Sequence, residues 1–194
     1  MLFSNHMPFQ YFFFDTYPGY FLQILPIAVL TGIVYAVVKF RHDQETPLYR
    51  KISAVLFVCY LAGLICLVLA FDLIWNMWYR LLYHMEIHTE RRLFGGVFNF
   101  IPDFFLHWKR KETIGNILAF FPFGILYPLA KSGRTWKQTV IAGFLCSLTI
   151  EILQPVVGRA FDINDIILNT LGVLISVSAF YAISELLKKR KFAS

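Results

Sequence analysis

Acidic, amide and guanidinium side chains gather in and beside three apolar stretches in the second half of the chain. Glu151 and Gln154 are three residues apart near the end of one stretch, and Arg159 lies in the turn that follows it. A carboxylate can take a proton, a metal ion or a sugar hydroxyl, and a guanidinium can bind a phosphate. The candidate ligand-binding residues are Asn116, Glu151, Gln154, Arg159, Asp162, Asp165 and Asn169.

The depth of Glu151 indicates that it needs a polar partner. If its helix leaves the hydrocarbon near Val157, Glu151 lies about 9 Å inside, at roughly 1.5 Å per residue. An acidic side chain at mid-span costs about 2.5–3.5 kcal/mol on insertion scales, and less near the interface. We therefore expect Glu151 to face other polar groups and not lipid.

The spacing of the polar residues predicts two facing stripes. Glu151 and Gln154 are three apart, whereas Asp162, Asp165 and Asn169 are three and four apart, so each set lines one side of a helix. A tight turn joins the two stretches. The stripes should therefore face each other across it.

Two further side chains can join these stripes. Asn116 lies in the first turn of the preceding apolar stretch, and Arg159 can pair with Glu151, Asp162 or Asp165. One interpretation is a hydrogen-bonded clasp, with Asp162 or Asn164 also capping the last helix. The other is a shallow polar pocket that opens outward at headgroup depth. Both can hold at once.

A second set of polar residues gives a weaker pattern. His84 and His88 are one helical turn apart, a spacing that can bind a metal. The order of residues differs from the His-Glu-x-x-His motif of zinc hydrolases, and a solvated surface is expected there. We predict no metal site, and the sequence leaves the cofactor and the catalytic residues unassigned.

The composition indicates a protein embedded in lipid. The chain of 194 residues is 58% hydrophobic and 15% charged, whereas soluble domains are about 45–50% apolar and about 25% charged. Its net charge of +6 comes from basic residues scattered in short loops, which does not favour nucleic acid as a partner. We expect one membrane-embedded domain over residues 1–194, with membrane lipids as partners.

The apolar stretches predict an all-α polytopic fold with about five membrane-spanning helices, since each approaches the length of about 20 residues that a bilayer requires. The third contains Pro122 and Pro128, and we expect a kinked span there. A re-entrant segment is the alternative, and it would invert everything that follows. The predicted spans are Tyr20–Val38, Ile52–Phe71, Ile114–Ala130, Thr139–Val157 and Ile166–Ser184.

Basic residues predict the orientation, because Lys and Arg are retained on the cytoplasmic side. They are dense in alternate connections and sparse at the N-terminus, which gives an N-out/C-in topology. The long outer loop, Asp72–Thr113, is rich in aromatic residues, and we expect it to lie on the membrane interface with a short surface helix. The basic residues are Lys39, Arg41, Arg50, Lys51, Lys131, Arg134, Lys137, Lys188, Lys189, Arg190 and Lys191.

Three motifs in order resemble those of the VanZ-like membrane proteins, over a region of about residues 99–184. Asn164 departs from the pattern, where an acid is expected in the family. The matching residues are Asn99 and Pro102, then Gly115, Asn116, Pro122 and Gly124, then Glu151, Gln154, Arg159, Asp162, Asp165, Asn169 and Gly172.

The resemblance implies a bacterial, multi-pass cell-membrane protein related to one that gives low-level resistance to glycopeptide antibiotics such as teicoplanin. It supplies a phenotype and not a reaction. Our leading hypothesis is that an outward-facing polar pocket acts on lipid-linked or lipidated envelope molecules, such as a lipid-linked cell-wall precursor or a lipoglycopeptide, and thereby influences tolerance.

Two alternatives stay open, so the sequence does not decide whether the protein is an enzyme. One is a membrane-embedded enzyme acting on a phospholipid or a lipid-linked cell-wall intermediate, with Glu151 or Asp165 as general base. The other is a small lipid flippase or transporter. The lack of an internal sequence repeat counts against it.

Overall fold

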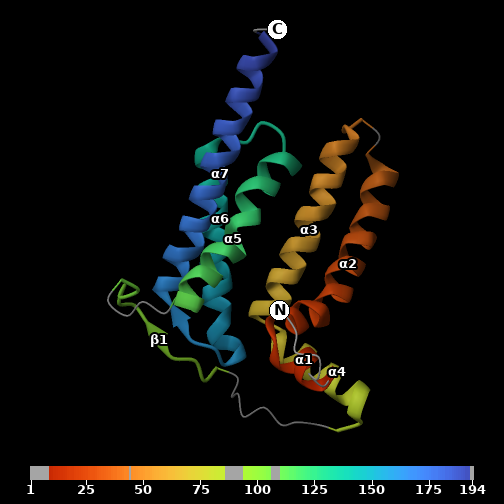
Figure 1. The fold of residues 1–194 in the computed structure, drawn as a ribbon, viewed down its shortest axis with the longest axis vertical. Helices are drawn as coiled ribbons and strands as arrows, with labels where there is room; N and C mark the ends of the chain where they lie inside the picture. Colours follow the sequence, from red (N-terminus) through yellow and green to blue (C-terminus); the bar gives the residue numbers. More distant parts are fainter. Residues whose placement is uncertain (1–8, 44, 86–93, 106–109, 193–194) are drawn as a thin grey trace.

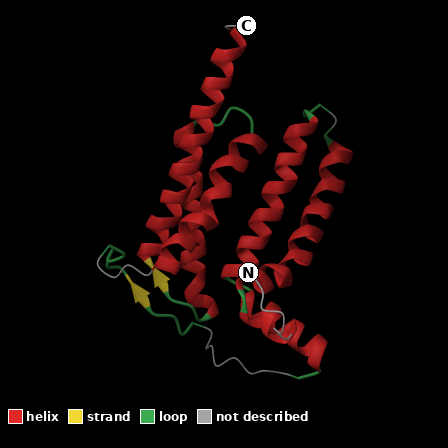
Figure 2. Cartoon of the chain, viewed as in Figure 1, coloured by secondary structure: helices red, strands yellow, loops and turns green. Residues whose placement is uncertain are grey.

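The computed structural model describes residues 9–43, 45–85, 94–105 and 110–192. Helices dominate this part of the chain, and two short strands lie near one end of the molecule (Figure 2). The elements in chain order are α1 (Phe9–Asp15), α2 (Tyr17–His42), α3 (Leu48–Val68), α4 (Phe71–Tyr83), β1 (Phe98–Asn99), α5 (Arg110–Ala130), α6 (Trp136–Leu153), the 3₁₀ helix η1 (Gln154–Val157), β2 (Phe161–Asp162) and α7 (Ile163–Phe192).

Five helical segments are long and apolar enough to cross a membrane, which confirms the predicted all-α polytopic fold. Each is longer than the predicted stretch, because the helix begins two to four residues earlier, although the second ends at Val68, before the predicted Phe71. The segments are Tyr17–His42, Leu48–Val68, Glu112–Ala130, Trp136–Val157 and Ile163–Lys189.

The third span is one continuous helix, so the re-entrant alternative is wrong. α5 passes through Pro122 and Pro128 without a break, and it packs against α7 between the strand end of the bundle and the α5–α6 connection (Figure 1). Tyr60 of α3 donates a hydrogen bond of 2.8 Å to the carbonyl oxygen of Ala119. Contacts with α3 and α7 hold α5 on both sides.

The spans pack in two groups that meet between α3 and α5. α2 packs on α3, while α5, α6 and α7 form a second group (Figure 1). A cluster of apolar side chains from α3, α5, α6 and α7 joins the groups. Its buried members are Leu64, Phe120, Phe123, Ile150 and Val173.

Small residues at Gly124 and Gly172 let α5 and α7 approach closely. A Cβ on Gly172 would overlap with the carbonyl oxygen of Ile117, and one on Gly124 would lie 2.7 Å from that of Val173. Because a methyl group does not fit in either space, the glycines are required for this crossing.

The two ends of the molecule differ in chemistry. The α2–α3 and α5–α6 connections and the C-terminal end of α7 lie at one end, whereas α1, α4 and the strands lie at the other (Figure 1). The basic connections named above therefore share one end. Its location in the cytoplasm stays a prediction.

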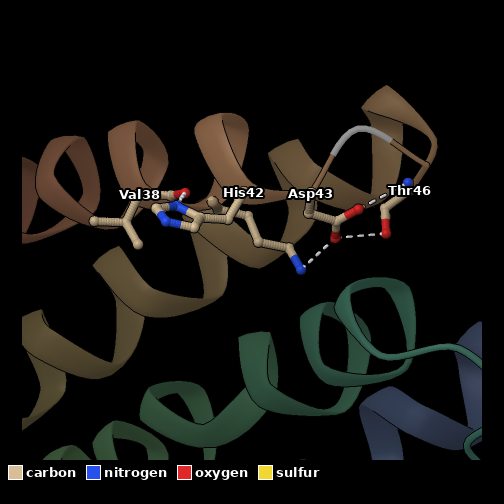
Figure 3. Close-up of polar contacts among 5 residues, drawn as sticks. Val38, His42, Asp43 and Thr46 are labelled. Carbon is tan, nitrogen blue, oxygen red and sulfur yellow. Dashed lines mark hydrogen bonds and ion pairs between the residues drawn. The ribbon is translucent and has the colours of Figure 1, made fainter.

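At the basic end, a compact turn closes α2 (Figure 3). The Asp43 carboxylate accepts hydrogen bonds of 3.0 Å from Thr46 N and 2.7 Å from Thr46 Oγ1. The ammonium of Lys39 lies 2.5 Å from Asp43 Oδ2. The hydrogen bonds from Lys39 and Thr46 hold the pKa of the Asp43 carboxyl well below its usual range. His42 Nδ1 lies 3.1 Å from the carbonyl oxygen of Val38 in the same turn.

At the opposite end, α1 and α4 lie side by side below α2 and α3 (Figure 1). The Phe14 ring packs against Trp75 and Tyr79 at centroid distances of 5.4 and 5.1 Å. On the other side of α4, Leu73 and Met77 are exposed. This amphipathic helix is the short surface helix predicted for the outer loop, and its contact with the membrane interface stays a prediction.

Candidate functional site

The turn between α6 and α7 brings the conspicuous polar residues together. Pro155 lies in the first turn of η1, and Gly158 follows in the left-handed region at φ 76°. The N–H groups of Gly158 and Arg159 bond back to Pro155 O and Gln154 O, at 3.1 and 3.0 Å. Gly158 allows the reversal because a residue without Cβ adopts a positive φ easily. Gln154 is buried, and its backbone carbonyl helps to close the turn.

A segment of the long connection between α4 and α5 lies against this turn; we call residues 94–105 the strap. Its strand β1 pairs in parallel with β2, with Phe98 opposite Phe161 and Asn99 opposite Asp162. Side chains alternate along strands, so the aromatic pair and the polar pair lie on opposite faces. Gly96 packs against the turn, with no room for a Cβ beside Arg159 O.

Glu151 of α6 is buried beneath this ribbon, with 0% of its surface exposed. Its Oε1 accepts a hydrogen bond of 2.8 Å from the backbone N–H of Asp162. Its Oε2 is buried and has no hydrogen-bond partner within the described part of the chain. Glu151 also interacts electrostatically with Asp165, Asp162 and Arg159. The deep acid thus faces polar groups, as expected.

Asp162 links the strap to the start of α7. Its Oδ1 accepts hydrogen bonds of 3.1 Å from Asn99 Nδ2 and 2.9 Å from the backbone N–H of Asn164. The second contact caps the helix, since it satisfies an N–H of the first turn. Of the two caps considered from the sequence, Asp162 is the one present.

Asn164 fastens the strap. Its Oδ1 accepts hydrogen bonds from the backbone N–H groups of Asp103 and Phe104, at 3.0 and 3.2 Å. Its Nδ2 donates to Asp103 Oδ1 at 2.8 Å. Sequence reasoning missed Asp103 and this role of Asn164. The sequence signal that could have indicated these contacts was the motif at Asn99, because it places a polar segment before the third span.

Two more contacts join the helices to one another. Asn116 Nδ2 of α5 donates to Asp165 Oδ1 of α7, and Asn169 Nδ2 of α7 donates to Ser147 Oγ of α6 at 3.0 Å. Ser147 is a buried partner that the sequence reasoning missed. We call Asn116, Glu151, Asp162, Asp165 and Asn169 the polar cluster.

Arg159 lies beside the polar cluster and reaches a different helix. Its Nη1 donates a hydrogen bond of 2.7 Å to the carbonyl oxygen of Val68, the last residue of α3. Of its three predicted carboxylate partners, Glu151 and Asp165 interact with it electrostatically. A cation at a helix C-terminus is favourable because the last carbonyls lack partners. Arg159 therefore ties α3 to the α6–α7 turn.

The polar cluster combines a hydrogen-bonded clasp between helices with one carboxyl oxygen that can accept a further hydrogen bond. Hydrogen bonds join α5, α6, α7 and the strap, while Glu151 Oε2 offers a buried oxygen to a donor. No group of three metal-ligating side chains occurs in the described ranges. Of the histidine pair, His84 follows the last residue of α4, and His88 lies outside the described residues.

Comparison with known proteins gives a family. The family model described as VanZ/LLP1 matches residues 27–185. The match starts inside α2, well before Asn99, where the predicted region begins. The prediction began later because the first two spans have only hydrophobic patterns and no distinctive motif. No curated protein and no solved structure matches the chain.

Proposed function

Since the chain belongs to the VanZ/LLP1 family, we propose that it raises tolerance to glycopeptide antibiotics of the teicoplanin type. In this proposal the polar cluster acts from the outer face of the bacterial cell membrane. It changes how lipid-linked or lipidated envelope molecules occupy the outer leaflet. An antibiotic that depends on such molecules, or that carries a lipid tail itself, would then meet fewer productive binding sites.

One observation carries this proposal: polar side chains from three helices meet at one end of the spans, and a buried oxygen of Glu151 has no hydrogen-bond partner among the described residues. A purely structural clasp gains nothing from an unsatisfied acceptor, which costs about 1–3 kcal/mol when buried. Intramembrane ionisable residues mark functional sites by default for the same reason. A ligand that supplies the missing donor would offset this cost.

Antibiotic susceptibility of matched strains tests the proposal. Wild type, Glu151→Gln and Arg159→Ala are expressed at equal membrane levels, and the minimum inhibitory concentration of teicoplanin is measured. We expect wild type to raise this concentration and both variants to return it to that of the empty-vector strain. Glu185→Gln is the control, because Glu185 is an exposed carboxylate near the far end of α7.

Unchanged tolerance in folded Glu151→Gln and Arg159→Ala proteins would remove the polar cluster from the mechanism. If Glu151→Gln does not accumulate in the membrane, Asp165→Asn replaces it. Asp165 is only half-buried, and the Asp165→Asn variant still has a polar side chain next to Asn116.

A further inference from the structure

The amide groups around the polar cluster already donate hydrogen bonds within the protein. Among the described side chains, Asn99 Nδ2 donates to Asp162 and Asn116 Nδ2 donates to Asp165. Asn169 Nδ2 donates to Ser147 Oγ. Each Nδ2 carries two N–H groups, so these contacts use one donor of each amide.

The acceptors are in surplus. Among the described residues, no donor reaches the buried Glu151 Oε2, while Glu151 Oε1 accepts a backbone N–H. Asp162 and Asp165 lie around it, half-buried and therefore closer to the surface.

The charge of the site also disfavours an anion. The carboxyl groups of Asp162 and Asp165 interact with each other and with that of Glu151, and the one guanidinium that these interactions include, among the described side chains, acts on Glu151 and Asp165. That guanidinium, from Arg159, donates through Nη1 to the carbonyl oxygen of Val68. A phosphate placed among these carboxylates would be repelled, whereas a cation would be attracted.

We propose that the polar cluster binds a primary ammonium group, whose N–H bonds point to the oxygens of Glu151 and of Asp162 or Asp165. This inference rests on the proposed function and names the chemical class that its site recognises. An ammonium group supplies three donors in a small volume and compensates the acidic charge. A quaternary ammonium has the charge but no N–H, so it cannot fill the Glu151 acceptor. The ammonium can come from a lipid headgroup or from a free amine in water.

Thermal unfolding of the purified full chain in detergent micelles tests this assignment, because a ligand that binds the folded state raises the unfolding midpoint. The probes are phosphatidylethanolamine, phosphatidylcholine, phosphatidylglycerol and free ethanolamine at matched concentrations. We expect phosphatidylethanolamine to raise the midpoint of wild type above that reached with phosphatidylcholine or phosphatidylglycerol. A comparable rise with ethanolamine assigns a soluble amine, and a rise with the lipid alone assigns a headgroup.

Variants locate the effect at the polar cluster. Glu151→Gln should lose the difference between phosphatidylethanolamine and phosphatidylcholine, whereas the control Glu185→Gln should keep it. If Glu151→Gln gives no cooperative transition, Asp165→Asn is measured with the same expectation.

Three outcomes would overturn the assignment: equal shifts with phosphatidylethanolamine and phosphatidylcholine, a larger shift with phosphatidylglycerol, or an ammonium-dependent shift retained in both variants. The measurement is separate from the test of tolerance. Loss of ammonium binding in Glu151→Gln with unchanged teicoplanin tolerance would contradict the proposed function and leave the ligand class standing.

Discussion

Asn164 and Glu151 illustrate two different uses of a buried polar side chain. Every polar atom of the Asn164 amide contacts the strap, through the backbone N–H groups of Asp103 and Phe104 and the carboxylate of Asp103. Glu151 instead has one oxygen that no donor in the described part of the protein reaches. The first residue therefore holds the site together, and the second gives the site its capacity to bind.

Removal of the Asn164 amide should release the strap. Asn164→Ala deletes hydrogen bonds that contribute about 0.5–1.5 kcal/mol each. We expect faster amide hydrogen exchange at Asp103 and Phe104, with α5–α7 amides unchanged, because the opening is local. Thr170→Val on the same helix is the control, since Thr170 Oγ1 bonds only to Ile166 O of its own helix. Equal protection of the strap in Asn164→Ala and Thr170→Val would show that other contacts hold it.

At the scale of helices, the crossing of α5 and α7 brings Asn116 and Asp165 into contact. Gly172 lies against the backbone of Ile117, one residue beyond Asn116. The two backbones therefore come closest one residue from Asn116, whose short amide side chain must reach Asp165. Close helix packing and the geometry of the polar cluster depend on the same glycine.

Gly172→Ala should separate α5 from α7. The added methyl group overlaps with Ile117 O, and overpacking of this kind costs about 1–3 kcal/mol. We expect a lower thermal unfolding midpoint in detergent and a loss of the ammonium-dependent shift. Gly115→Ala is the matched control on α5, because a Cβ there meets nothing within 4 Å. It should leave the midpoint unchanged or raise it, since alanine favours a helix by up to about 1 kcal/mol over glycine. Equal midpoints for the two variants would contradict the required close approach.

For the molecule as a whole, the polar cluster and the basic connections lie at opposite ends of the spans (Figure 1). Positive residues are retained in the cytoplasm, so the polar cluster is expected at the outer surface. The strap and α4 lie at that same end, where their exposed apolar side chains, including Leu73 and Phe98, suit the membrane interface.

Cysteine labelling of intact cells tests this orientation. In a background with the native cysteines replaced, Ala160→Cys reports on the polar end and Ser132→Cys on the basic end, because both positions are exposed. We expect an impermeant thiol reagent to label Ala160→Cys in intact cells and Ser132→Cys only after permeabilisation. The reverse pattern would place the polar cluster in the cytoplasm.

Local hydropathy was enough to define the spans and to place Glu151 at a depth that requires a partner. Each of these inferences depends on residues close together in the chain, because a helix long enough to cross lipid is a local property. The facing of α6 and α7 was also predictable, since a short turn joins them and their polar residues follow helical spacing.

Tertiary structure alone decided which distant groups complete the site. Arg159 bonds to Val68, 91 residues away, and Asn164 bonds to Asp103, 61 residues away. Strands of two residues, such as β1 and β2, are too short for a periodic sequence pattern that would predict them. The physical reason is that a hydrogen-bonding group in a sequence shows only that it needs a partner. The path of the folded chain determines which partner comes within reach.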